Sequence, residues 1–113
     1  MTKLAERSCK PCEGGALPMR AEQVEQLLPA LHEDWRLSDD GLEISRTFGF
    51  PAYSRTLGFA NAAAWIAIVE GHHPVLTFSY KFCTVSYTTH AVNGLTDNDF
   101  ICAAKTDLLV HDG

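Results

Sequence analysis

Five histidines occur in the chain, and three of them flank a single segment with the alternation of paired strands. His72 and His73 are adjacent before this segment, and His90 follows it. An antiparallel hairpin returns its second end beside its first, so His90 is expected near the adjacent pair. Imidazole titrates near pH ~6.5 and exchanges protons at neutral pH. The spacing therefore predicts one acid-base site for a small polar substrate.

Each of these histidines also has other interpretations. His72 could stabilise the negative end of a helix dipole, and His90 could simply fill a strand end. Three imidazoles, or two with a carboxylate, can also bind zinc or iron. Adjacent residues at a helix end point about 100° apart, so His72 and His73 are poor co-ligands for one ion. The expected site therefore contains no metal.

Two carboxylates accompany the histidines. Asp99 ends the segment Thr96-Asp97-Asn98-Asp99, which predicts a capping box at a helix start and leaves Asp99 able to hold or polarise a histidine as well. Glu70 precedes His72 by two residues and is expected to be a solvated acid at a helix end.

Apolar periodicity predicts the helices that position these residues, over 19–31, 54–70 and 97–110. The inward-facing positions are expected to be Val24, Leu27, Leu28 and Leu31, then Leu57, Ala60, Ala64, Ile66 and Val69, and then Phe100, Ala103, Ala104 and Leu108. Hairpins are expected over 35–50, around the turn-rich Ser38-Asp39-Asp40-Gly41, and over 75–90. The order α-β-β-α-β-β-α predicts an α+β fold, a four-stranded antiparallel sheet with three helices packed on one face.

Length and charge limit the other possibilities. With 113 residues, 46% of them hydrophobic, the chain is expected to form one domain over 18–113, after an irregular arm over 1–17. A net charge of −5 without a basic stripe argues against nucleic acid. The longest apolar run, 62–69, is far below the ~20 residues of a membrane span, and no signal peptide is recognisable, so a cytoplasmic protein is expected.

The arm contains a lone CxxC, Cys9 to Cys12. Neither Cys83 nor Cys102 supplies the second CxxC of a zinc ribbon, and the motif does not follow a strand as a thioredoxin-type motif would. Reduced, incidental or stabilising cysteines are favoured, with an intermolecular zinc or redox role as the alternative.

Several segments together resemble the pterin-4a-carbinolamine dehydratases. They are Glu70-Gly71-His72-His73-Pro74, Thr88-Thr89-His90, and the segment 94–101 leading into Ala103-Ala104-Lys105. The resemblance spans about 17–109, and the CxxC arm is similar to that of longer bacterial members. It implies the same α+β fold and the dehydration of 4a-hydroxytetrahydropterin, left by aromatic amino acid hydroxylases such as phenylalanine hydroxylase, to quinonoid dihydropterin. No cofactor is implied, because the pterin is the substrate.

The resemblance also implies roles for single residues. It assigns His72, His90 and Asp99 as catalytic, and His73, Pro74 and Thr89 as substrate-binding. Loss of water needs one proton delivered to the departing hydroxyl and one removed from the neighbouring ring nitrogen, which paired imidazoles can provide. Three positions depart from the family pattern: Asn98 is Arg in animal members, Val75 replaces a frequent acid, and Phe82-Cys83 replaces a commoner Lys-Val pair. None of them removes a proposed proton carrier.

A protein-binding scaffold is the competing hypothesis, because relatives of this fold serve as dimerisation cofactors of a transcription factor or as Rubisco assembly factors. An open sheet edge that can pair with another chain supports it. A scaffold has no need of the histidine set, which favours the enzyme. A homodimer or homotetramer built through sheet edges or helices is expected in either case.

Overall fold

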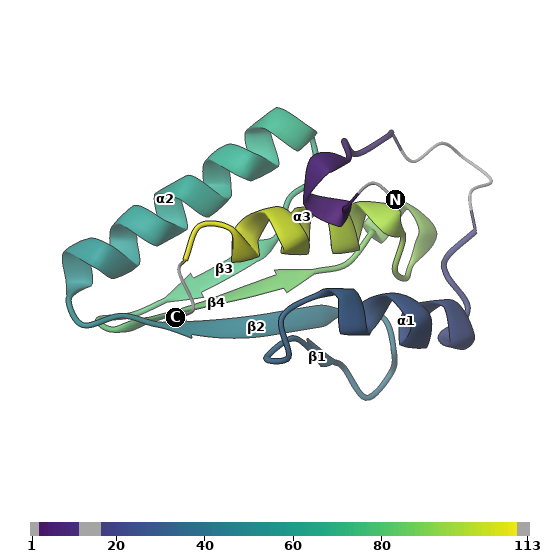
Figure 1. The fold of residues 1–113 in the computed structure, drawn as a ribbon, viewed down its shortest axis with the longest axis horizontal. Coiled ribbons are helices and arrows are strands. Elements are labelled where there is room, and N and C mark those ends of the chain that lie inside the picture. The colour runs from purple at the N-terminus through teal and green to yellow at the C-terminus, as the bar shows by residue number, and fades with distance from the viewer. Residues whose placement is uncertain (1–2, 12–16, 111–113) are drawn as a thin grey trace.

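The computed structural model describes residues 3–11 and 17–110 and has the expected order of helices and strands (Figure 1). The helices are α1 (Ala21–Leu27), α2 (Tyr53–Glu70) and α3 (Asp97–Asp107), and the strands are β1 (Arg36–Leu37), β2 (Ile44–Gly49), β3 (Val75–Phe78) and β4 (Phe82–Tyr87). Three single 3-10 turns, η1 (Leu4–Glu6), η2 (Leu28–Ala30) and η3 (His90–Val92), complete the described elements.

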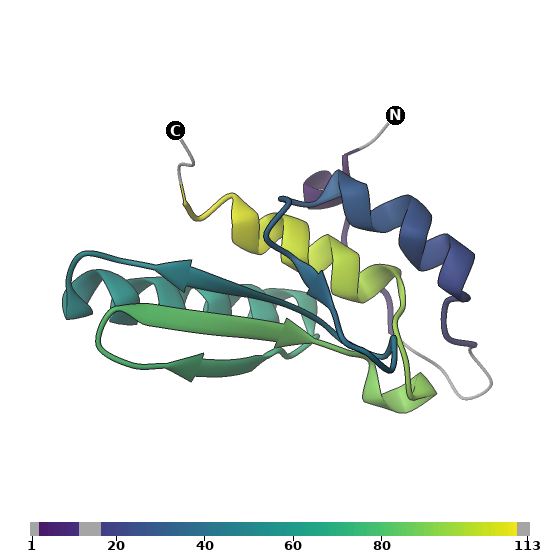
Figure 2. The same ribbon diagram turned by 90° about the horizontal axis from the view of Figure 1, so that it is seen from below.

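The four strands form one antiparallel sheet in the order β1-β2-β4-β3. The helices lie on one of its faces, as the two perpendicular views show (Figures 1 and 2). The predicted fold class is therefore confirmed. In the second hairpin Val75 is opposite Ser86, so the residues before β3 lie beside those after β4.

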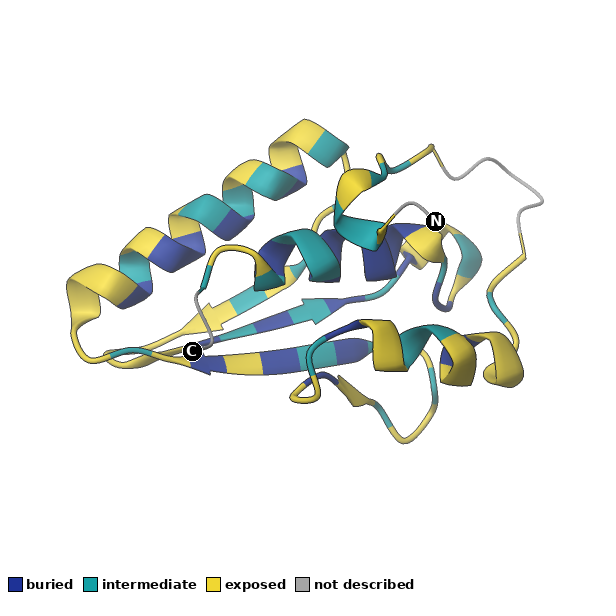
Figure 3. Cartoon of the chain, in the orientation of Figure 1, coloured by how far each residue is buried: buried dark blue, intermediate teal, exposed yellow. Residues whose placement is uncertain are grey.

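The core lies between the sheet and the helices, where the alternation of β2 and β4 directs every second side chain. The buried set on the two strands is Ile44, Arg46, Phe48, Cys83, Val85 and Tyr87. Phe59 of α2 and Phe100 of α3 pack against it, and the buried stripes along these helices are visible in Figure 3. The opposite face of the sheet carries hydroxyl side chains such as Thr47 and Thr84, which hydrogen bond to each other.

Near the ends of the helices, the structure differs from the predictions in three places. The first helix ends at Leu27 because Pro29 follows, and its last turn is the 3-10 turn η2. Val69 was expected to face inward and is 60% exposed, because the buried stripe of α2 runs from Thr56 to Ala67 and Val69 lies off it. Leu108 is 70% exposed because α3 has already ended at Asp107.

Although α2 has 18 residues, no helix in the described ranges combines the length and apolar character needed to cross a membrane.

A buried ion pair joins β2 to the end of α3, and the sequence patterns did not predict it. Arg46 is 5% exposed on the inner face of the sheet, and its Nη1 lies 2.7 Å from Oδ1 of Asp107. The same carboxylate accepts the indole N–H of Trp35 at 2.8 Å and the backbone N–H of His32 at 3.2 Å. Asp107 therefore anchors two segments and a buried cation at once.

Candidate active site

The end of α2 positions the first two histidines. Gly71 takes the left-handed conformation (φ 68°) that commonly terminates a helix and that favours glycine. The backbone N–H groups of Gly71 and His72 both donate to the carbonyl of Ala67, at 2.9 and 3.2 Å. This closed turn places His72 and His73 directly before β3.

One pocket brings the three histidines together. It has a volume of about 600 Å³ and lies where α2 ends, β3 begins and β4 leads into η3. The sequence-predicted residues on its wall are His72, His73, Pro74, Thr89 and His90. Asp99 is completely buried behind this wall, in contact with His72.

The strongest polar contact at the pocket joins His72 to Asp99. The Nε2 atom of His72 lies 2.6 Å from Oδ1 of Asp99, and the two side chains are 12% and 0% exposed. The other carboxylate oxygen accepts the hydroxyl of Thr89 at 2.7 Å and the backbone N–H of Thr96 at 3.0 Å. Asp99 completes the predicted capping box of α3 and simultaneously holds His72.

This arrangement restricts the His72 ring in two ways. The Nε2 atom is engaged by Asp99, and an ionised carboxylate can only accept a hydrogen bond, so Nε2 is the donor whenever Asp99 is ionised. The ring also stacks on Tyr87, with centroids 5.8 Å apart and planes within 7°. Burial raises the pKa of Tyr87, so this neighbour stays neutral. The contact with Asp99 and the stacking on Tyr87 therefore hold the His72 ring in one orientation.

The other predicted residues differ from His72 in exposure. His73 and His90 are exposed at the pocket, and both are accessible to a bound molecule. Pro74 is half-buried between His73 and β3. Thr89 is only 3% exposed and its hydroxyl contacts Asp99, so it belongs to the network that supports His72.

Glu70 was expected to be a solvated acid, and this expectation is wrong. Its side chain is 10% exposed, with Oε2 3.8 Å from Nζ of Lys105. Its Oε1 accepts the backbone N–H of Cys9 at 2.8 Å. The N-terminal arm thus reaches the pocket, where Cys9, Lys10 and Pro11 line the wall. No periodicity in the sequence indicated this contact, because an irregular segment carries no such signal.

The metal and cysteine alternatives concern the same region. Among residues 3–11 and 17–110, no group of three His, Cys, Asp or Glu side chains is arranged to hold a metal ion. Cys12 lies outside the described residues, so the CxxC motif is not placed as a whole. Cys9, Cys83 and Cys102 are free thiols.

The chain is similar to the members of one known protein family. The family described as pterin 4 alpha carbinolamine dehydratase matches residues 17–109. A protein of Nitrosomonas eutropha, provisionally named a pterin-4-alpha-carbinolamine dehydratase, is 53% identical over 107 residues, which cover 95% of this chain and 93% of its own. A protein of Legionella pneumophila (strain Corby) with the same provisional name is 47% identical over 109 residues, or 96% of each chain.

Two solved structures resemble the fold. The transcriptional coactivator/pterin dehydratase of Brucella melitensis superposes with a TM-score of 0.78 at 30% identity, over 83% of this chain and 99% of its own. A pterin dehydratase-like protein described as a RuBisCO assembly factor in the alpha-carboxysome superposes with a TM-score of 0.62 at 22% identity, over 73% and 95% of the two chains. The second likeness concerns the fold alone.

Proposed function

Because the chain belongs to the pterin 4 alpha carbinolamine dehydratase family, we propose that it converts 4a-hydroxytetrahydropterin to quinonoid dihydropterin and water by histidine acid-base catalysis. The observation that carries this proposal is the contact of His72 with the buried Asp99, in a pocket that His90 also lines. The product is the pterin that aromatic amino acid hydroxylases use after reduction. A hydroxylase such as phenylalanine hydroxylase would therefore be its functional partner.

The reaction breaks the bond between the 4a carbon and its hydroxyl oxygen, and a proton must reach that oxygen so that it leaves as water. The neighbouring ring nitrogen loses its proton, and a carbon–nitrogen double bond forms. His72 and His90 would share these two transfers, since imidazole both gives and takes protons at neutral pH. Asp99 would keep the His72 ring in one orientation, and His73 and Pro74 would position the substrate.

The purified protein is expected to accelerate the loss of water from freshly generated 4a-hydroxytetrahydropterin. The reaction can be followed by the increase in absorbance at a wavelength where quinonoid dihydropterin absorbs. Free imidazole at the same concentration as the protein's histidines is the matched control, because only a preoriented pair should exceed it. A rate equal to that in buffer would contradict the enzyme hypothesis.

A non-catalytic scaffold is the second candidate, and the open edge of the sheet favours it. β3 is an edge strand with exposed apolar side chains at Val75 and Phe78, and such a strand can pair with another chain. The related protein from Brucella melitensis is described as a transcriptional coactivator/pterin dehydratase, so the two roles are compatible in one fold. If the protein is a scaffold without activity, its rate of pterin dehydration should not exceed that of the imidazole control.

The same exposed surface supports a homodimer or homotetramer. Trp65, Ile68 and Val69 are exposed on α2, the helix that β3 contacts. A second copy could cover this apolar surface and pair with the free strand edge. We expect sedimentation at micromolar concentration to give a multiple of the 12.4 kDa chain mass. Ile68→Lys should shift the protein toward monomer, and Leu42→Lys in the first hairpin should not; a monomeric wild-type protein would refute the assembly.

A further inference from the structure

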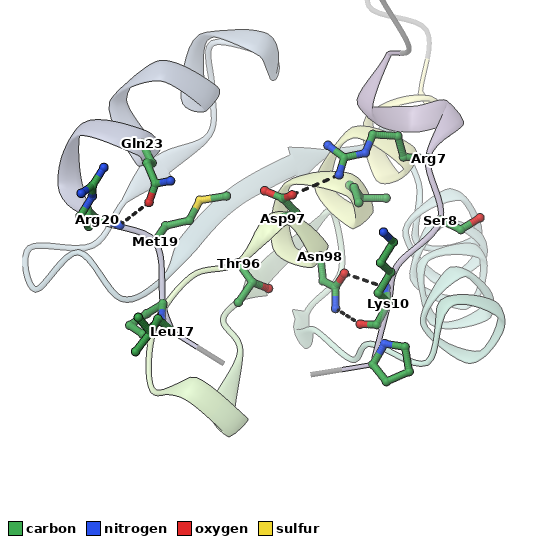
Figure 4. Close-up of a pocket in the computed structure, with 13 residues that line it drawn as sticks. Arg7, Ser8, Lys10, Leu17, Met19, Arg20, Gln23, Thr96, Asp97 and Asn98 are labelled. Atoms are coloured by element: carbon green, nitrogen blue, oxygen red, sulfur yellow. Dashed lines mark hydrogen bonds and ion pairs between the residues drawn. The ribbon is translucent and has the colours of Figure 1, made fainter. Parts of the chain in front are cut away.

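The arm residues Cys9, Lys10 and Pro11, which we call the arm wall, form one side of the histidine pocket. They come from a segment that packs against α3 through η1. Lys10 and Pro11 also line a second pocket of about 570 Å³, between the arm, the start of α1 and the start of α3 (Figure 4). The arm wall is therefore the partition between the two pockets.

Two side chains next to the proposed catalytic residues hold the arm wall by its backbone. Asn98, beside Asp99, is 8% exposed; its Oδ1 accepts the Lys10 N–H at 3.0 Å, and its Nδ2 donates to the Lys10 carbonyl at 2.6 Å (Figure 4). Glu70, two residues before His72, accepts the Cys9 N–H at 2.8 Å. These contacts satisfy the backbone N–H groups of Cys9 and Lys10 and the carbonyl of Lys10, none of which belongs to a strand or helix.

The arm wall is an addition to the shared fold. The family match begins at residue 17, after the arm, whereas the Nitrosomonas eutropha relative aligns over 95% of this chain. The Asn98 amide has both an acceptor and a donor, so this one side chain pairs with the N–H and with the carbonyl of Lys10.

We propose that the arm wall positions the pterin substrate in the histidine pocket, and that Asn98 and Glu70 are positioning residues that hold this wall in place. The inference rests on the proposed dehydratase function. A bound pterin would contact the wall in the ground state and in the transition state alike. Releasing the wall should therefore raise KM and leave kcat nearly unchanged, because uniform binding is lost and proton transfer is not.

A cysteine contact offers a way to restore the wall once it is released. The Sγ atoms of Cys9 and Cys102 lie 3.4 Å apart, and a disulfide requires about 2.05 Å. Cys9 is half-buried whereas Cys102 is completely buried, and the hydrogen bond between the two thiols lowers the pKa of Cys9, so Cys9 is the attacking sulfur. It would attack oxidised glutathione and release one glutathione thiol; Cys102 would then displace the second. The protein loses two electrons and two protons, and the glutathione disulfide gains them.

The test is Asn98→Ala in a Cys12→Ser background, so that Cys9 cannot form a disulfide with Cys12. The matched control is Asn61→Ala, the same change at an exposed position of α2. Loss of two hydrogen bonds to the wall should raise KM about tenfold. The value of kcat should stay within about twofold of the parent value at each pH. Binding of 7,8-dihydrobiopterin, which lacks the hydroxyl on the 4a carbon and cannot be dehydrated there, should weaken by a similar factor. Asn61→Ala should change neither quantity.

Oxidation then separates wall position from general damage. Closing the Cys9–Cys102 disulfide with oxidised glutathione should return KM of Asn98→Ala toward the parent value, dithiothreitol should reverse this, and adding Cys9→Ser should abolish the rescue. A parental KM and dihydrobiopterin affinity in Asn98→Ala would overturn the inference, as would a fall in kcat with KM unchanged. Absence of turnover in the parent protein would instead overturn the proposed function, while dihydrobiopterin binding would still decide the role of the wall.

Discussion

His72→Ala or His90→Ala is expected to lower kcat for pterin dehydration by about 10²- to 10⁴-fold, the range for removal of a positioned acid or base. His72 lies at the pocket with its Nε2 bound to the buried Asp99. His90 is exposed in the same pocket, after the second strand of the hairpin. His90 is exposed, and in His72→Ala the buried Asp99 keeps its hydrogen bonds from Thr89 and Thr96, so both variants should remain folded. Stopped-flow absorbance would measure kcat, and thermal unfolding would measure stability.

His32→Ala is the matched control for this loss of imidazole. His32 is also half-buried, but it lies between η2 and β1, accepts the backbone N–H of Asp34 and is not part of the pocket lining. Its removal should leave kcat close to that of the parent. Equal kcat values for the parent, His72→Ala and His90→Ala would remove the basis for histidine catalysis in this pocket.

Asp107→Ala is expected to reduce the free energy of unfolding by about 3–5 kcal/mol, because it removes the carboxylate that lies 2.7 Å from the buried Arg46 guanidinium. The carboxylate also accepts from the indole of Trp35 and the backbone of His32, so three donors from two segments lose their common acceptor. Urea unfolding followed by tryptophan fluorescence would measure the change through the shift in midpoint.

The control for this substitution is Asp97→Ala, at the other end of α3. Asp97 pairs with Arg7 at 3.1 Å, but the two side chains are 52% and 38% exposed. Solvent-exposed ion pairs contribute little, so the loss should stay within about 1 kcal/mol. Similar destabilisation by the two variants would show that the burial of the Arg46–Asp107 pair has no special weight.

Elements with a strong local pattern were predictable from the sequence. Alternation determines which side chains of β2 and β4 face the helices, and the capping box determines where α3 begins, because both signals depend only on neighbouring residues. The nearness of His72 and His90 also followed, since a hairpin brings its two ends together whatever its exact turn. The sequence by itself therefore determined the fold class and the group of histidines at the pocket.

The partners of single polar side chains depended on the tertiary structure. Glu70 and Asn98 bind backbone groups of the arm, and Arg46 reaches Asp107, across separations of 61 to 88 residues. Such contacts follow from how elements pack, and no local periodicity encodes them. The same packing buries Asp99 against His72 and leaves His90 exposed. The three histidines, equivalent as residue types, thereby acquire different environments, because burial and hydrogen bonding belong to the assembled fold and not to the residue.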